Sequence, residues 1–197
     1  MHHMVNPTEP FVQDAAVRYA INNTASRFTV QAFAGGLLAS LGHNPVITIP
    51  DFSGEVRLPE NVADASVHMV INAASLKVAS DVKDKDRREM ERMMHEQVLQ
   101  SAEYPEIAYD CSSVSASKTG EGQYWTALKG ELTLHGVTRG LTISPRVTVN
   151  GETLRASGSF SILQTDYEIE LVSVMGGALK VKDELKFVFE IVGRKQE

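Results

Sequence analysis

Near its end the chain contains the segment Leu185-Lys186-Phe187-Val188-Phe189-Glu190-Ile191, in which apolar and polar side chains alternate. Leucine, phenylalanine and isoleucine occupy every second position, whereas lysine and glutamate lie on the opposite face. Successive side chains of a β-strand point to opposite faces of the sheet, so this pattern predicts a strand with one buried face. A single buried face is typical of antiparallel sheets.

The same alternation recurs along most of the chain, with short clusters of turn-forming residues between the segments. These segments are residues 18–22, 27–33, 46–49, 52–58, 66–73, 106–113, 122–135, 141–149 and 153–163. Asn150-Gly151 separates the last two, and it is a strong hairpin signal because both central residues of a type I′ turn need a positive φ. Many short strands with such turns are typical of a β-sandwich or a closed barrel.

One segment, residues 84–100, has a helical period instead. Pro105 follows shortly after its end. Five basic and five acidic residues lie within residues 83–97, so their charges cancel and favour a solvated helix face over a docking patch. The apolar side carries Met90, Met93, Met94 and Val98. We interpret the methionines as core packing in preference to a binding groove, although methionine is adaptable enough to serve as both.

The composition is that of an ordinary soluble protein, with 197 residues, 43% of them hydrophobic, and a formal net charge of −6. The acidic balance argues against a nucleic-acid or anionic-membrane binder, because both need clustered Lys and Arg. The single cysteine, Cys111, excludes an internal disulfide and a cysteine-cluster zinc site. We expect a loosely ordered N-terminal segment over residues 1–16, in which His2-His3 before a second Met is typical of a tag remnant, and one domain over residues 17–197.

Residues 28–50 carry no charge and are long enough to cross a bilayer. Their glycines, prolines and a His-Asn pair would leave backbone groups unsatisfied in lipid, so we predict no transmembrane helix. The first residues lack an apolar stretch after a basic region and therefore predict no secretory signal. The expected location is the cytoplasm, or the periplasm if a leader has been removed.

Catalytic motifs are missing from the sequence. His95-Glu96 resembles the start of a zinc-protease motif, but Leu99 stands where the second histidine is required. There is no Gly-x-Ser-x-Gly elbow, Walker loop or Gly-x-Gly-x-x-Gly motif. Cys111 lies in a predicted strand, where a buried, inert thiol is expected. His43 and His135 lie in turn-like segments and would form a metal site or an acid/base pair if they met at one rim, or each would only fix a turn by bonding backbone.

Three segments together resemble the YceI-like family of lipocalin-like, polyisoprenoid-binding proteins. The first is Lys129-Gly130-Glu131-Leu132-Thr133-Leu134-His135-Gly136-Val137-Thr138-Arg139, the second is Glu103-Tyr104-Pro105-Glu106-Ile107-Ala108-Tyr109, and the third is Ala156-Ser157-Gly158-Ser159-Phe160-Ser161-Ile162 with Asp166 after it. The resemblance extends over residues 18–194. Two segments depart from it. Residues 163–168 keep an Asp and an aromatic residue but lose the family's Arg and Gly, and residues 42–45 differ from the expected glycine-rich strand.

The resemblance implies an all-β fold with one helix: an extended, antiparallel, eight-stranded lipocalin-like barrel with the helix packed alongside. It also implies an apolar tunnel for a polyisoprenoid or an isoprenoid-tailed quinone, without a catalytic residue, metal or cofactor. The inward-facing apolar residues expected to line this tunnel are Phe28, Val30, Met69, Ile71, Leu132, Phe160, Ile162, Leu185, Phe187 and Phe189. At its mouth, a polar head group would meet His43, His135 and Asp166.

Three functions follow as hypotheses. The first is a non-catalytic protein that sequesters, transports or stores an isoprenoid lipid, with a homodimer as one assembly. The second is a small metal-dependent enzyme or metal-binding protein centred on His43 and His135. The third is an accessory protein of a stress response that acts through partners.

Overall fold

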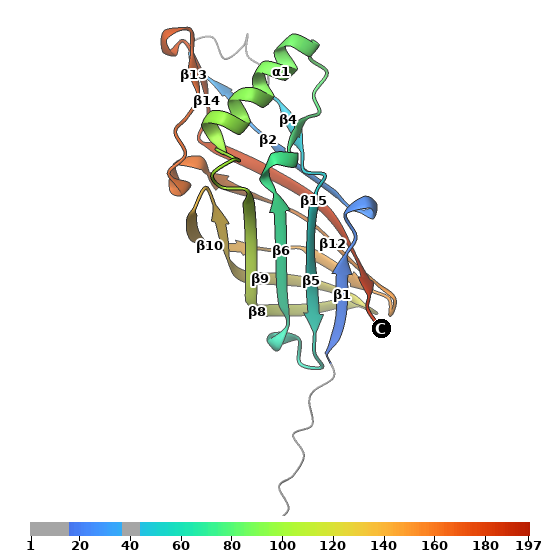
Figure 1. Ribbon diagram of the computed structural model, residues 1–197. Helices are drawn as coiled ribbons and strands as arrows, with labels where there is room; N and C mark the ends of the chain where they lie inside the picture. Colours follow the sequence, from blue (N-terminus) through green and yellow to red (C-terminus); the bar gives the residue numbers. More distant parts are fainter. Residues whose placement is uncertain (1–15, 37–43) are drawn as a thin grey trace, which may run out of the picture.

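The chain forms a closed antiparallel β-barrel with one helix at one end, in a computed structural model that describes residues 16–36 and 44–197 (Figure 1). The barrel closes because the first strand pairs with the last strand as well as with its other neighbour. The eight strands around it are, in order, β1 (Val17–Ile21), β5 (Phe52–Leu58), β6 (Ser66–Asn72), β8 (Glu106–Gly120), β9 (Gln123–Leu134), β11 (Arg146–Val149), β12 (Thr153–Leu163) and β15 (Glu184–Lys195). The predicted all-β class and the extended eight-stranded barrel are confirmed.

Shorter strands extend the wall at the helix end of the barrel. β15 pairs with β1 through its last residues and with β2 (Arg27–Gln31) through its first half. β4 (Val46–Thr48) and β7 (Lys77–Val78) continue from β2, and β10 (Val137–Ile143) pairs with β9 beyond β11. A separate three-stranded sheet consists of β3 (Ala34–Gly35), β14 (Leu179–Val181) and β13 (Ser173–Val174).

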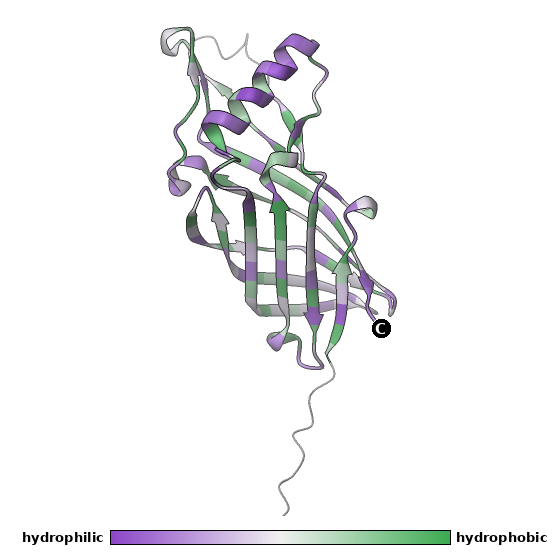
Figure 2. Ribbon diagram, in the orientation of Figure 1, coloured by the Kyte–Doolittle hydropathy of each residue, from purple (hydrophilic) through white to green (hydrophobic). Residues whose placement is uncertain are grey.

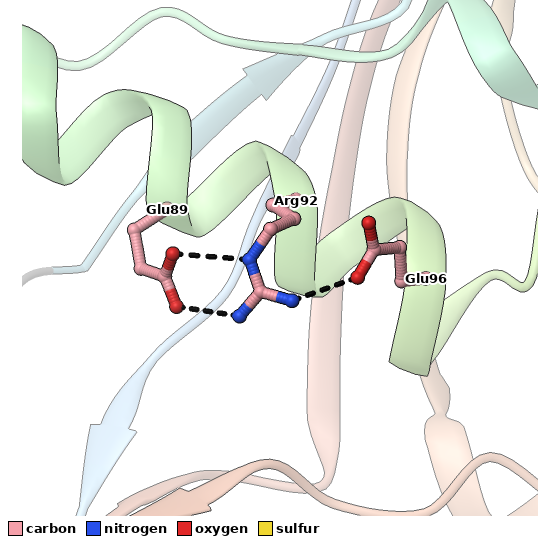
Figure 3. A network of polar contacts seen from close by, with 3 residues as sticks. All are labelled: Glu89, Arg92 and Glu96. Atoms are coloured by element: carbon pink, nitrogen blue, oxygen red, sulfur yellow. Dashed lines mark hydrogen bonds and ion pairs between the residues drawn. The ribbon is translucent and has the colours of Figure 1, made fainter.

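The helix predicted over residues 84–100 forms as α1 (Asp84–Met93), followed by one π-helical turn (Met94–Val98). It lies across the upper end of the barrel in Figure 1. On its outer face Arg92 pairs with Glu89 and Glu96, each at 2.7 Å between nitrogen and oxygen (Figure 3). All three side chains are exposed, so water and salt screen these pairs, and they contribute little to the stability of the helix. Within the described parts of the chain, no helix is long and apolar enough to cross a membrane.

The alternation in β15 has the predicted consequence in three dimensions. Phe189 and Ile191 are buried, whereas Lys186 and Glu190 are exposed on the other face. The neighbouring β12 aligns with β15 over eleven residue pairs, from Thr153 opposite Arg194 to Leu163 opposite Glu184. Figure 2 shows the same change of hydropathy from residue to residue along the long strands. The sheet therefore directs one apolar side chain in two toward a shared interior.

The turn with two positive φ values that is predicted at Asn150-Gly151 forms at a different hairpin. Asn150-Gly151 does join two strands, but only Gly151 has a positive φ, because Asn150 Oδ1 accepts hydrogen bonds from the backbone and hydroxyl of Thr153 instead. The two-residue turn with two positive φ values lies between β9 and β10, where His135 has φ 53° and Gly136 has φ 73°. Histidine tolerates this conformation better than bulkier residues, although sequence patterns rarely mark it as a turn former.

The structure also gives the positions of Cys111, Pro145 and the predicted N-terminal segment. Cys111 is buried, with 4% of its surface exposed. Pro145 separates β10 from β11 and is fully buried. The predicted N-terminal segment, residues 1–16, lies outside the described residues except for Ala16.

Candidate functional site

The barrel encloses a cavity of about 510 Å³. Its wall is built from the inward-facing residues of the strands, and α1 adds Met90 and Met93 at one end. Leu58 and Val149 belong to the wall where β5 and β11 end. Glu60 is the only charged residue that lines the cavity within the described ranges, and it is exposed. The interior therefore suits an apolar, elongated ligand.

Nine of the ten residues predicted to line a tunnel do line this cavity. They are Phe28, Val30, Met69, Ile71, Leu132, Phe160, Leu185, Phe187 and Phe189. The prediction for Ile162 needs correction. It is 6% exposed and belongs to the packed core, but it is not part of the cavity wall. An inward-facing side chain in a barrel this narrow either packs against its neighbours or borders open space, and Ile162 does the former.

Four phenylalanines form one side of the cavity. Phe160 and Phe187, directly opposite each other on β12 and β15, stack with their ring centroids 4.7 Å apart. Phe28 lies 6.1 Å from Phe187 and 6.2 Å from Phe189 between ring centroids. Such aromatic pairs hold one another in place, so this side of the cavity is a preformed surface.

Two hydroxyl groups in the wall are already bonded to backbone. The hydroxyl oxygen of Tyr109 lies 3.0 Å from the carbonyl oxygen of Leu128 and 3.2 Å from that of Leu141, and its single hydrogen is shared between these two acceptors. Burial raises the pKa of Tyr109, so the hydroxyl stays neutral. Thr126 donates to the carbonyl oxygen of Pro145 at 2.9 Å. The hydrogen-bond donors of these two residues are therefore used within the barrel, and Tyr124 is the third residue of the wall with a hydroxyl group.

Gln164 is the polar cavity residue that the sequence analysis missed. It begins the short 3-10 helix η6 (Gln164–Tyr167) after β12, and only 3% of its surface is exposed. Its side-chain nitrogen donates to the carbonyl oxygens of Lys182 and Asp183 at 2.9 and 3.4 Å. The available signal was its position within residues 163–168, where the sequence departs from the expected family pattern.

The methionines of the helix segment line the cavity, and one of them also packs in the core. Met90, Met93 and Met94 all border the cavity, and Met94 is buried. As a group, these methionines therefore serve both roles that the sequence allows, core packing and cavity wall. Methionine is flexible enough to follow the shape of a ligand as well as that of a protein core.

His135 and Asp166, predicted at the mouth, do not line the cavity. Nδ1 of His135 lies 3.2 Å from the carbonyl oxygen of Tyr167, which can only accept, so this nitrogen donates. Its Nε2 is buried without a partner among the described residues. Asp166 is exposed, and its backbone oxygen accepts a hydrogen bond from Arg139 at 3.0 Å. Both residues therefore lie where the β9–β10 hairpin contacts η6. This position does not support the predicted contact with a head group.

Within the segment 129–139, the described contacts of His135, Gly136 and Arg139 are structural, because they connect the β9–β10 hairpin to neighbouring parts of the chain. The ring of Tyr104 lies 4.5 Å from that of His135 between centroids. A Cβ added to Gly136 would lie 2.7 Å from the Tyr104 ring, so only glycine fits beside it. Together with Arg139, these contacts fasten the β9–β10 hairpin to the chain after the helix and to η6.

His43, the other member of the predicted metal site or acid/base pair and a predicted mouth residue, lies outside the described residues. Among the residues that are described, no group of three or more His, Cys, Asp or Glu side chains is arranged to hold a metal ion.

The closed barrel, the helix across its end and the apolar interior define the chain as a lipocalin-like barrel with an internal cavity. Residues 19–193 match the family model described as YceI-like domain. The chain belongs to the YceI-like family.

Several solved structures share this fold. A polyisoprenoid-binding domain from Saccharophagus degradans, implicated in plant cell wall breakdown, superposes with a TM-score of 0.66 at 14% identity over 90% of this chain and 98% of that one. BcnA of Burkholderia cenocepacia gives a TM-score of 0.64 at 19% identity over 87% and 98%. The YceI protein of Campylobacter jejuni gives 0.55 at 13% identity over 77% and 85%. A comparison with curated protein sequences finds no match.

Proposed function

We propose that this protein binds a polyisoprenoid, or a quinone with an isoprenoid tail, inside the barrel, and that it sequesters, transports or stores this lipid without chemical change. The single observation behind the proposal is the apolar cavity of about 510 Å³. The name of the Saccharophagus degradans domain supports the class of ligand.

The size of the cavity suits a prenyl chain of moderate length. A water-sized group occupies about 30 Å³, so the cavity holds about 17 chain atoms, or about three isoprene units. Each buried methylene contributes about 0.8 kcal/mol, and fifteen carbons therefore contribute about 12 kcal/mol before the cost of association. A longer lipid would extend past one end of the barrel.

The chemistry of the wall favours binding over catalysis. Catalysis by side chains requires a nucleophile or an acid/base pair close to the substrate. The hydroxyl groups of Tyr109 and Thr126 donate hydrogen bonds to backbone carbonyls, and Cys111 is buried outside the cavity wall. The remaining titratable groups of the described wall, the hydroxyl of Tyr124 and the carboxylate of Glu60, belong to no catalytic motif, so the wall gives a prenyl chain mainly shape and hydrophobic contact.

The experiment has two parts. The protein is purified without added lipid, extracted with organic solvent and examined by mass spectrometry, and the delipidated protein is then titrated with farnesol, which has fifteen carbons. We expect a co-purifying isoprenoid lipid or saturable binding of one farnesol per chain. Absence of both would overturn the proposal.

A blocked variant provides the control for the second part. Leu132 lies on the inner face of β9, and Leu132→Trp would place a larger ring inside the cavity. Glu131, its neighbour on the same strand, is exposed, so Glu131→Trp adds the same ring outside the barrel. Binding inside the cavity predicts that only Leu132→Trp weakens farnesol binding in a protein that still melts cooperatively.

A further inference from the structure

The side chain of Gln164 stands out within the apolar cavity. It is a neutral amide, 3% exposed, in a wall composed almost entirely of hydrocarbon. From its geometry we infer that Gln164 is a polar anchor that accepts a hydrogen bond from the hydroxyl group of a prenyl alcohol. This inference rests on the proposed function and specifies the head group of the ligand.

The orientation of the amide is fixed by its neighbours. One end of the side chain faces two backbone carbonyl oxygens, those of Lys182 and Asp183. Carbonyl oxygens only accept hydrogen bonds, so this end must be the NH₂ group, which has two hydrogens to donate. Both hydrogens are then used, and the amide oxygen Oε1 must point the other way.

The oxygen Oε1 has no donor among the described residues. The backbone of Gln164 does not compete for it, because its N–H donates to Asp183 O and its carbonyl accepts from Ile169 N–H. Gln164 borders the cavity, and Oε1 is not fully enclosed by protein atoms, since His135 Nε2 is the one enclosed and unpartnered side-chain atom in the described structure. An amide oxygen that borders an apolar cavity without a donor lacks the hydrogen bonds that water would supply, so a ligand that donates one there would be favoured.

The chemistry of the surroundings restricts that donor. A cationic head group would need a counter-charge, and an anionic one would need a cation. Glu60 is the only charged residue in the wall among the described ranges, and it lies in the β5–β6 connection, whereas Gln164 begins η6. A neutral acceptor in this place fits a hydroxyl group and disfavours a phosphate.

The test compares farnesol with farnesyl methyl ether. The two ligands share one tail, but only the alcohol can donate a hydrogen bond. For the unaltered protein we expect farnesol to bind about fivefold to tenfold more tightly than the ether. Gln164→Met keeps the length of the side chain and removes the acceptor, so this preference should fall to less than twofold while the ether binds as before. Gln123 is an exposed glutamine on β9, and Gln123→Met should keep the preference.

A second variant guards against a failure of Gln164→Met to fold. Gln164→Arg retains donors for the carbonyls of Lys182 and Asp183 and introduces no acceptor, so it should also abolish the preference for the alcohol. Equal binding of alcohol and ether by the unaltered protein, or an undiminished preference in either folded variant, would overturn the inference and leave the proposed function standing. Failure of the unaltered protein to bind either ligand would count against the proposed function itself.

Discussion

The length of the bound chain should be limited by the volume of the cavity, and a substitution at Ala156 tests this limit. Ala156 lies on the inner face of β12, between Val147 of β11 and Ile191 of β15, and borders the cavity. Ala156→Phe adds six carbon atoms there. At about 30 Å³ for each water-sized group, the ring takes up about 180 Å³ of the 510 Å³ cavity.

The expected effect is the loss of about one isoprene unit. The capacity falls from about 17 to about 11 chain atoms, which is enough for geraniol, with ten carbons, but not for farnesol, with fifteen. Five further methylene-sized groups contribute about 4 kcal/mol before ordering costs, so the unaltered protein should bind farnesol at least about tenfold more tightly than geraniol. Ala156→Phe should bind the two alcohols with nearly equal affinity.

Isothermal titration of both alcohols into both proteins measures this difference directly. Ser157 is the next residue on β12 and is exposed, so Ser157→Phe adds a phenylalanine ring at the outer surface and should leave the length preference intact. Melting curves establish that each variant is folded. If Ala156→Phe folds and still favours farnesol tenfold, the ligand does not occupy the cavity as described, and the reasoning from its volume is refuted.

Two further predictions concern stability. Gly136→Ala should lower the free energy of unfolding by about 1–3 kcal/mol, because φ is 73° and the new Cβ would lie 2.7 Å from the Tyr104 ring. Gly140 has open space around it, so the control Gly140→Ala should change the free energy of unfolding by less than about 0.5 kcal/mol. Equal urea midpoints for the two variants would contradict this account. Hydrogen bonds from Thr165 hold the pKa of the Asp183 carboxyl group below its ordinary value. The ionised carboxylate therefore stabilises the folded state at pH values above the pKa that Asp183 has in the unfolded chain, and this stabilisation is lost as the pH falls through the pKa of the folded state. Urea midpoints from pH 3 to 6 should therefore fall more steeply with acid in the unaltered protein than in Asp183→Asn, and parallel curves would argue against the assignment.

Periodicity in the sequence predicts most of the fold and less of the site. The alternation in β15 and the helical period of residues 84–100 identify elements correctly because tertiary packing follows the same faces. The cavity cannot be read from alternation, because Leu132 beside it and Ile162 in the packed core have the same inward-facing pattern. Whether an inward residue meets another side chain or open space depends on the pairing of strands that are distant in sequence.

The roles of the polar residues are even harder to predict from the sequence than the lining of the cavity. His135 is prominent in the sequence as a titratable residue in a turn, yet its contacts are with Tyr104 and with the backbone of Tyr167. Gln164 lacks any catalytic motif, and its importance arises from two carbonyls that lie 18 and 19 residues further along the chain. The orientation of an amide depends on such distant partners, which no local pattern contains.

The pairing of β1 with β15 also determines when the cavity can exist. Tyr19 lies opposite Lys195, 176 residues away in sequence, so the wall closes only after nearly the whole chain has been synthesised. Contacts at such separation require costly loop closure and are typical of slow-folding, high-contact-order proteins. A cavity ligand has no complete site before that closure and should therefore bind after the folding barrier. It would prolong the lifetime of the folded barrel by slowing its unfolding, without accelerating its formation.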